Sequence, residues 1–288
     1  MHPMTILRAA LFVGLLVGNA PAQVAKVLEL ADVAAALAAR SGQPEGSVSS
    51  LGRLARLLRA HWQEETQAAA KGAPVRRRRA TLQLEEKSNT MLVSAMQQQA
   101  DLAEDIVDQL RKGPARELRV HCTLVHLPMQ VATEHGLVAG QVTPIDEPTA
   151  GTLLKAAVRA KGRLQNLPEQ TVLPLRPFRA EPPAEPGKAA AAATTLRVHG
   201  EAVLVSDQEA LLGVQLVAGD LPEDPTLVPL VARFAKTFRL QVGTGIVVLA
   251  PPAKDAPADA PAVALWLQLV SVTAAPPAKK PADADAGK

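Results

Sequence analysis

The chain has 288 residues and a formal net charge of +3, a near balance that does not by itself point to nucleic acid. Hydrophobic residues make up 48 % of it, enough to bury a core, whereas aromatic residues make up 2 %, which argues against an aromatic-lined ligand pocket or a base-stacking platform. Because Cys122 is the one cysteine, an intramolecular disulfide is excluded, and so are zinc sites that need two or four cysteines.

Residues 1–22 have the pattern of a secretory signal peptide. Arg8 supplies a positive charge, residues 9–17 form an apolar run, and Ala20 and Ala22 place small residues where a signal peptidase recognises them. The apolar run is shorter than the roughly 20 residues that a membrane-spanning helix needs. We therefore expect an exported chain that begins at Gln23; the alternative is an N-terminal anchor helix that is never cleaved.

The next segment combines a stretch of mixed character with a clear helix. Residues 24–40 alternate irregularly, and their expected core positions are Leu28, Leu30, Val33 and Leu37. A helix is predicted after Ser49 or Ser50, either of which can cap its first turn. Its apolar side chains recur at helical spacing, at Leu51, Leu54, Leu57, Leu58 and Trp62. Its arginines, Arg53, Arg56 and Arg59, are expected on the opposite face.

Residues 81–112 predict a strand, a turn, a strand and a helix. Alternation predicts strands at 81–85 and 90–95, and Asn89 suits the last position of the turn because its amide tolerates the left-handed region. Residues 98–112 predict an amphipathic helix with an apolar stripe formed by Leu102, Ile106, Val107 and Leu110. Together with the preceding helix, these elements predict a compact α+β module over residues 23–113.

Between the two parts of this module lies the sharpest charge run of the chain, Arg76, Arg77, Arg78 and Arg79. We expect a solvated linker or strand edge that charge keeps soluble. The alternative is contact with an anionic envelope polymer such as lipopolysaccharide or peptidoglycan. Nucleic acid is disfavoured because neither interleaved aromatic residues nor a second basic cluster accompanies the run.

The second half of the chain is predicted to be rich in strands. Residues 118–127 form a clear strand with Val120, Cys122 and Leu124 on its inner face, and residues 148–161 form a short helix with Leu153, Leu154 and Val158 inward. Further strands are predicted at 195–205, 211–217, 238–249 and 263–272. Proline and alanine dominate an insertion at about 180–194 and a tail at 273–288, so both are expected to be disordered. The β-rich region thus covers residues 118–272.

Candidate catalytic, cofactor and metal residues do not assemble into a site. His121 and His126 are an odd number of positions apart, so a continuous strand directs them to opposite faces, and Cys122 faces the core. Glu134-His135-Gly136 lacks a second histidine at helical spacing, and Gly243-Thr244-Gly245 lacks the Lys-Ser/Thr of a phosphate loop. The sequence predicts a protein that is not an enzyme and that uses no cofactor or metal.

Residues 82–112 resemble the short periplasmic N-domains of bacterial secretins, the ring-shaped outer-membrane channel proteins of type II secretion, type III secretion and type IV pili. The residues that carry this resemblance are Glu85, Ser88, Asn89, Leu92, Val93, Ile106 and Leu110. More weakly, residues 118–128 resemble the first strand of a secretin core, and residues 242–252 and 262–272 resemble its closing pair of strands.

The resemblance implies an α+β fold in which a small periplasmic N-domain precedes a β-rich secretin-like region. It further implies a self-associating protein in the periplasm or outer membrane of a Gram-negative-type bacterium, with other secretion or pilus components as partners. The apolar character of both faces in residues 245–249 and 265–272 favours buried strands, however, and so a shortened, non-conducting relative. The alternative function is a soluble periplasmic adaptor or binding domain.

Overall fold

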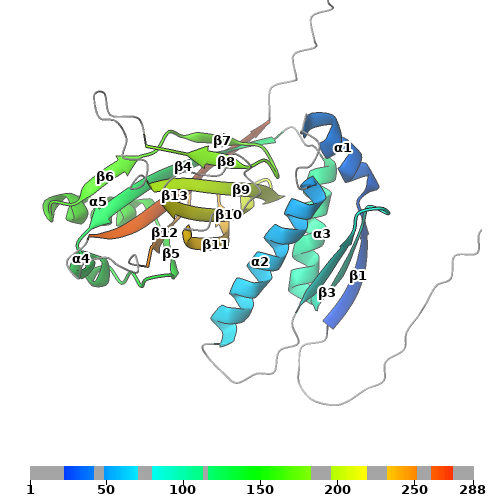
Figure 1. The fold of residues 1–288 in the computed structure, drawn as a ribbon, viewed down its shortest axis with the longest axis horizontal. Coiled ribbons are helices and arrows are strands. Elements are labelled where there is room, and N and C mark those ends of the chain that lie inside the picture. Colours follow the sequence, from blue (N-terminus) through cyan, green and yellow to red (C-terminus); the bar gives the residue numbers. More distant parts are fainter. Residues whose placement is uncertain are drawn as a thin grey trace, which may run out of the picture.

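The computed structural model describes residues 23–41, 49–70, 80–112, 116–182, 196–218, 232–251 and 261–274. Within these ranges the chain is a mixed α and β protein with one three-stranded, one four-stranded and one six-stranded sheet (Figure 1). The predicted signal peptide, the arginine run at 76–79, residues 183–194 of the insertion and residues 275–288 of the tail lie outside the described residues.

The N-terminal part builds the three-stranded sheet and three helices. Its elements are β1 (Gln23–Glu29), α1 (Ala31–Ser41), α2 (Ser50–Ala70), β2 (Thr81–Glu85), β3 (Thr90–Met96) and α3 (Gln97–Lys112). The sheet is antiparallel in the order β1-β3-β2. The sequence predicted α2, β2, β3 and α3 but not β1, whose alternation is broken by Lys26 on the side that faces the helices. The four core positions expected in residues 24–40 are all buried.

Helix α2 begins as predicted, because the Ser49 hydroxyl accepts a hydrogen bond from the Gly52 N–H at 2.9 Å. Its predicted apolar side chains are buried. Arg53, expected on the opposite face of the helix, is nevertheless only 2 % exposed. The reason is that α2 lies between two sheets, so that part of its polar side is covered as well, although Arg59 stays exposed.

The C-terminal part contains the other two sheets and two helices. Its elements are β4 (Arg116–Leu127), α4 (Met129–Glu134), β5 (Val142–Ile145), α5 (Glu147–Arg159), β6 (Arg163–Asn166), β7 (Gln170–Val172), β8 (Phe178–Ala180), β9 (Leu196–Ser206), β10 (Glu209–Ala218), β11 (Ala232–Gln241), β12 (Gly245–Leu249) and β13 (Ala262–Ala274). One sheet has the order β11-β10-β9-β8 and the other the order β5-β12-β13-β4-β6, with β7 paired to β4. Inward side chains of the two sheets form one core, in which Leu124, Leu212 and Leu265 are fully buried.

Two expectations for this part were wrong. The predicted strand at 238–249 is divided between β11 and β12 by a turn in which Gly243 has a φ of 80°. Val158 was expected inward but is 55 % exposed. Helix α5 packs through Ala150, Leu153 and Ala157, which recur at three and four residues, so the next position turns towards solvent. The short elements α4 and β5 to β8 were not predicted.

Helices α2 and α3 lie between the three-stranded sheet and the four-stranded sheet (Figure 1). Leu54, Leu57 and Leu58 of α2 share a hydrophobic cluster with Val203 and with neighbouring residues of β9 and β10. Strand β10 has a glycine, Gly213, where α2 packs against it. An added Cβ at this position would stand 2.7 Å from the Leu57 Cδ1 atom. The N-terminal and C-terminal parts therefore share a core.

Candidate interaction surfaces

One face of the three-stranded sheet is left uncovered by the helices. On this face Val27 of β1 pairs in register with Leu92 of β3, which pairs with Gln83 of β2. Val27 is 63 % exposed and Leu92 is 44 % exposed. In the next row, the exposed carboxylates of Glu29 and Glu85 lie on either side of Thr90. We call Val27, Glu29, Gln83, Glu85 and Leu92 the outer sheet face.

The residues of the secretin-like motif divide between this face, a turn and the core. Asn89 adopts the predicted left-handed conformation with a φ of 50°, and its carbonyl oxygen accepts a hydrogen bond from the Leu30 N–H at 2.7 Å. Val93, Ile106 and Leu110 are buried between the sheet and α3. Leu92 alone among the apolar motif residues points outward, which its place in the alternation of β3 dictates.

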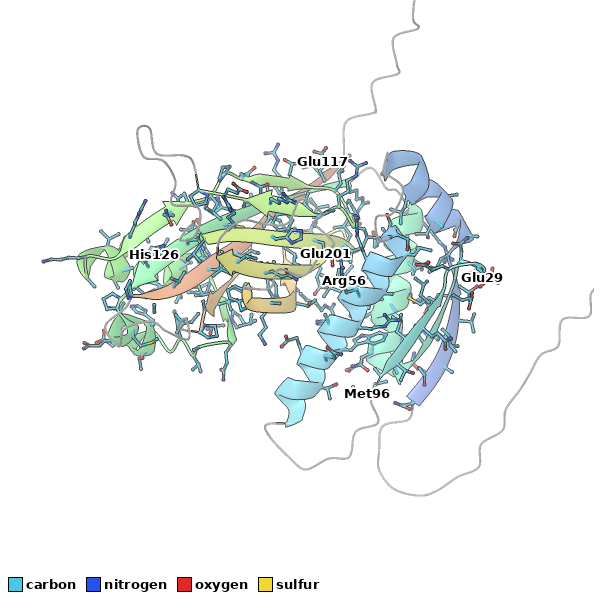
Figure 2. All side chains as sticks on the ribbon, viewed as in Figure 1. Glu29, Arg56, Met96, Glu117, His126 and Glu201 are labelled. Carbon is cyan, nitrogen blue, oxygen red and sulfur yellow. The ribbon has the colours of Figure 1, made fainter. Side chains whose placement is uncertain are left out.

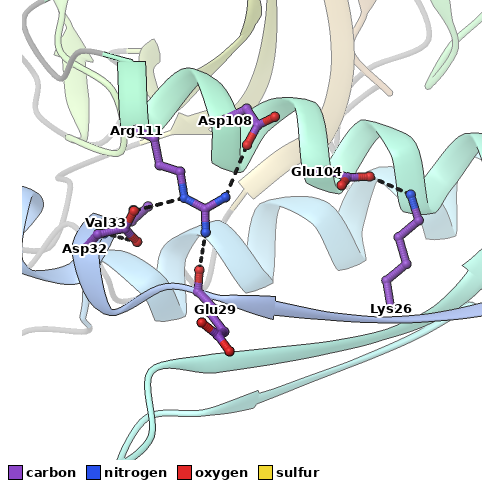
Figure 3. A network of polar contacts seen from close by, with 7 residues as sticks. All are labelled: Lys26, Glu29, Asp32, Val33, Glu104, Asp108 and Arg111. Atoms are coloured by element: carbon purple, nitrogen blue, oxygen red, sulfur yellow. Dashed lines mark hydrogen bonds and ion pairs between the residues drawn. The ribbon is translucent and has the colours of Figure 1, made fainter.

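A network of polar contacts fastens β1 to α3 (Figure 3). The Lys26 ammonium of β1 reaches the carboxylates of Asp101, at 2.8 Å, and Glu104. Near the end of α3, the Arg111 guanidinium contacts Asp32 and Asp108 and donates to the Glu29 carbonyl oxygen. Strand β1 has a single neighbour in the sheet, and these polar contacts attach it to α3 as well.

The pKa values of the network follow its contacts. The hydrogen bond to Asp101, followed by the one to Glu104, raises the pKa of Lys26 above its usual range. The same bond from Lys26 lowers the pKa of Asp101. The backbone N–H of Val33 lowers the pKa of Asp32, and Arg111 adds to this effect. Lys26, Asp32 and Asp101 are therefore charged at neutral pH.

A second polar set joins α2 to the four-stranded sheet. The Arg56 guanidinium lies 3.1 Å from the Glu201 carboxylate, and Figure 2 shows both side chains between the helix and β9. Lys236 of β11 pairs with Glu64 at 2.8 Å. We call the contact between α2 and the four-stranded sheet the seam. Deeper in it, Arg53 donates a hydrogen bond to the Leu175 carbonyl oxygen at 3.1 Å. Charged groups thus join α2 to the C-terminal part alongside the apolar contacts of Leu54, Leu57 and Leu58.

His199 of β9 lies in the same seam and is 8 % exposed. Burial, together with the positive charges of Arg179, Arg56 and Arg53, lowers its pKa to about 4. The imidazole is therefore neutral at physiological pH.

The residues weighed as chemical groups in the sequence do not converge. The His121 Nε2 atom lies 3.2 Å from the Thr123 hydroxyl, whereas the His126 Nε2 atom lies 3.1 Å from the Gln165 Oε1 atom, farther along the strand. Burial raises the pKa of the Cys122 thiol to about 12, so it is not a nucleophile at neutral pH. In the described ranges, His, Cys, Asp and Glu side chains form no group of three or more that could hold a metal ion.

At the end of the molecule opposite the outer sheet face, a cleft of about 340 Å³ opens between the end of β4 and the turn from α5 to β6. Its lining includes Leu127, Pro128, Lys161, Arg163 and Pro261, which we call the basic cleft. Gly162 permits the close approach of this turn to β4, because an added Cβ would collide with the His126 carbonyl oxygen. Figure 2 shows Glu29 and His126 at opposite ends of the long axis.

The part of the chain that the structure describes includes no helix long and apolar enough to cross a lipid bilayer.

Comparison with known proteins gives no match to a protein-family model and none to a curated protein sequence. Among solved structures, the chain is similar to the type II secretion secretin of Pseudomonas aeruginosa, with 9 % identity, a TM-score of 0.28, and coverage of 87 % of this chain and 75 % of that one. It is also similar to the type IV competence pilus secretin of V. cholerae, with 9 % identity, a TM-score of 0.25, and coverage of 88 % and 77 %. The Salmonella type III secretion injectisome secretin gives 10 % identity, a TM-score of 0.18, and coverage of 85 % of each chain.

Proposed function

We propose that this protein is a non-enzymatic, self-associating envelope protein, a secretin-like component of a secretion or pilus system. The observation that carries the proposal is the placement of the secretin-like motif. Its apolar residues Val93, Ile106 and Leu110 build a small wedge of sheet and helix, while Leu92 of the same motif is 44 % exposed on the outer sheet face. A paired, exposed Leu and Val on a sheet face is the kind of apolar patch that marks a protein interface.

Export is part of this proposal. The first described strand, β1, begins at Gln23, where signal cleavage after Ala22 is expected to start the exported chain. Cleavage there would leave the whole of β1 available to pair with β3. N-terminal sequencing of the protein from an envelope fraction should begin at Gln23; an intact N-terminus would contradict export by this route.

Self-association is tested on the purified protein by light scattering coupled to size-exclusion chromatography, with and without detergent. We expect a defined multimer whose mass is a whole-number multiple of the chain. Membrane fractionation followed by electron microscopy should place such multimers in the envelope. A protein that stays monomeric at high concentration in both conditions would contradict the proposal and favour a soluble periplasmic adaptor or binding domain.

A further inference from the structure

Two surfaces at opposite ends of the molecule are opposite in charge, and each also presents apolar residues. The outer sheet face presents an exposed apolar pair, Val27 and Leu92, beside the carboxylates of Glu29 and Glu85. The lining of the basic cleft combines apolar residues, Leu127 and Pro128 among them, with the basic residues Lys161 and Arg163. One surface is an exposed apolar pair with acidic neighbours, and the other is a cleft lined by apolar and basic residues.

The surroundings of the basic cleft extend this complementarity. On α5, the exposed side chains of Lys155, Val158 and Arg159 share one side of the helix because they are spaced three and four residues apart. Val158, which is 55 % exposed, therefore adds an apolar contact next to two positive charges. Lys161 has a left-handed φ of 61°, so the chain turns back after α5. This turn places the Lys161 side chain in the lining of the basic cleft.

Both surfaces lie away from the contacts that join α2 to the four-stranded sheet. The seam between α2 and the four-stranded sheet lies in the middle of the molecule, whereas the three-stranded sheet and the turn from α5 to β6 lie towards its two ends (Figure 1). One copy can therefore engage two others without disturbing its own core.

We propose that the outer sheet face of one copy binds the basic cleft of the next copy, with Leu92 and Val27 against its apolar lining and Glu29 and Glu85 facing the basic residues in and around it. This inference rests on the proposed self-association and names the surfaces responsible for it. Because the two surfaces differ, the contact is head-to-tail, and repetition of it gives a closed ring when the rotation between copies closes and a filament when it does not. Its charge pairs also predict that added salt weakens assembly.

The test uses two charge-reversed variants of the full chain, measured by sedimentation velocity. Glu29→Lys with Glu85→Lys reverses the outer sheet face, and Arg159→Glu with Lys161→Glu reverses the basic cleft. Each variant alone should associate at least about tenfold more weakly than the unchanged protein, because like charges then meet at the contact. An equal mixture of the two should regain association, since the reversed face of one variant matches the reversed cleft of the other.

Controls separate this inference from a loss of fold and from failure of the proposed function. Glu117→Lys, which lies between the two ends in Figure 2, should leave association unchanged, and circular dichroism should match among all variants. Leu92→Asp, at an exposed position, should abolish association without loss of fold. If the unchanged protein assembles but both reversals leave assembly intact, or if the mixture does not recover, these surfaces are not the contact. If the unchanged protein never assembles, self-association itself fails.

Discussion

At the scale of single residues, Asn89 has a structural role that the sequence already indicates. It holds a φ of 50° in the turn between β2 and β3, and its carbonyl oxygen fixes the start of α1 through Leu30. Asn89→Ala should lower the free energy of unfolding by about 1–2 kcal/mol, because a Cβ resists this conformation when no side-chain amide compensates. Asn89→Gly should cost clearly less, since glycine adopts the conformation freely. Urea denaturation measures both, and equal losses would contradict this role.

Residue-level expectations succeeded where a side chain depends on its own helix or strand and failed where it depends on a distant element. The apolar stripe of α3 and the core positions around Leu30 follow from local periodicity, and both are buried. The burial of Arg53 could not be predicted from the sequence, because residues far later in the chain, such as Leu175, cover it. Periodicity identifies an apolar stripe, but it gives no sign that a second surface will cover the polar side of a helix.

At the scale of elements, the packing of α2 depends on a strand residue without a side chain. A Cβ at position 213 would stand 2.7 Å from the Leu57 Cδ1 atom, inside a core shared by helix and sheet. Gly213→Ala should therefore lower the free energy of unfolding by roughly 1–3 kcal/mol through overpacking.

The matched control for this substitution is Gly151→Ala in α5, where an added Cβ meets no atom within 4 Å. This change should stabilise the protein by roughly 0.5–1 kcal/mol, because alanine favours the helix. Thermal and urea unfolding of the two variants give the comparison. Equal changes in the free energy of unfolding of both variants would show that the Leu57 side chain moves aside without a loss of stability.

Elements with strong periodicity or clear turn residues were predicted, and short ones were not. The hairpin of β2 and β3, helix α3 and the long strands β4, β9 and β13 all lie where the sequence placed them. Strands β5 to β8 have three or four residues each, too few for alternation to emerge, and their pairing with long strands defines them. The pattern of residues 238–249 predicts one continuous strand, whereas the turn at Gly243 divides this segment into the end of β11 and β12.

At the scale of the whole molecule, the shared core predicts that the N-terminal and C-terminal parts unfold together. The two tryptophans report on one part each, since Trp62 lies in α2 and Trp266 in β13. Trp62→Phe leaves Trp266 as the fluorescent probe, and Trp266→Phe leaves Trp62. After correction for any change in overall stability, each probe should follow the same transition as circular dichroism of its variant. Separate transitions within one variant would show two independent domains.

His199 gives the seam a defined dependence on pH. Its pKa is about 4 in the folded protein and about 6.5 in the unfolded chain, so the unfolded chain takes up the proton first as the pH falls. The free energy of unfolding should therefore decrease between about pH 6.5 and pH 4, by at most about 1.4 kcal/mol per pH unit.

The variant His199→Gln tests this expectation. It should show a flatter profile than the unchanged protein in that window, with each curve referred to its own value at about pH 7.5, where the imidazole is neutral in both states. Below about pH 4, protonation of carboxylates such as Asp101, whose pKa is lowered by Lys26, should destabilise both proteins alike. Parallel profiles over the whole range would show that the imidazole titrates freely in the folded state.

The position of β13 has a consequence for how the chain is made. This strand lies between β12 and β4 at the centre of the six-stranded sheet, yet it is the last of the described strands in the sequence. A nascent chain that ends before Ala262 leaves β4 and β12 with open backbone edges and leaves the leucines of β4 without their partners. The ribosome must therefore synthesise β13 before the six-stranded sheet can close. Truncated products that lack β13 should be substrates for quality-control proteases.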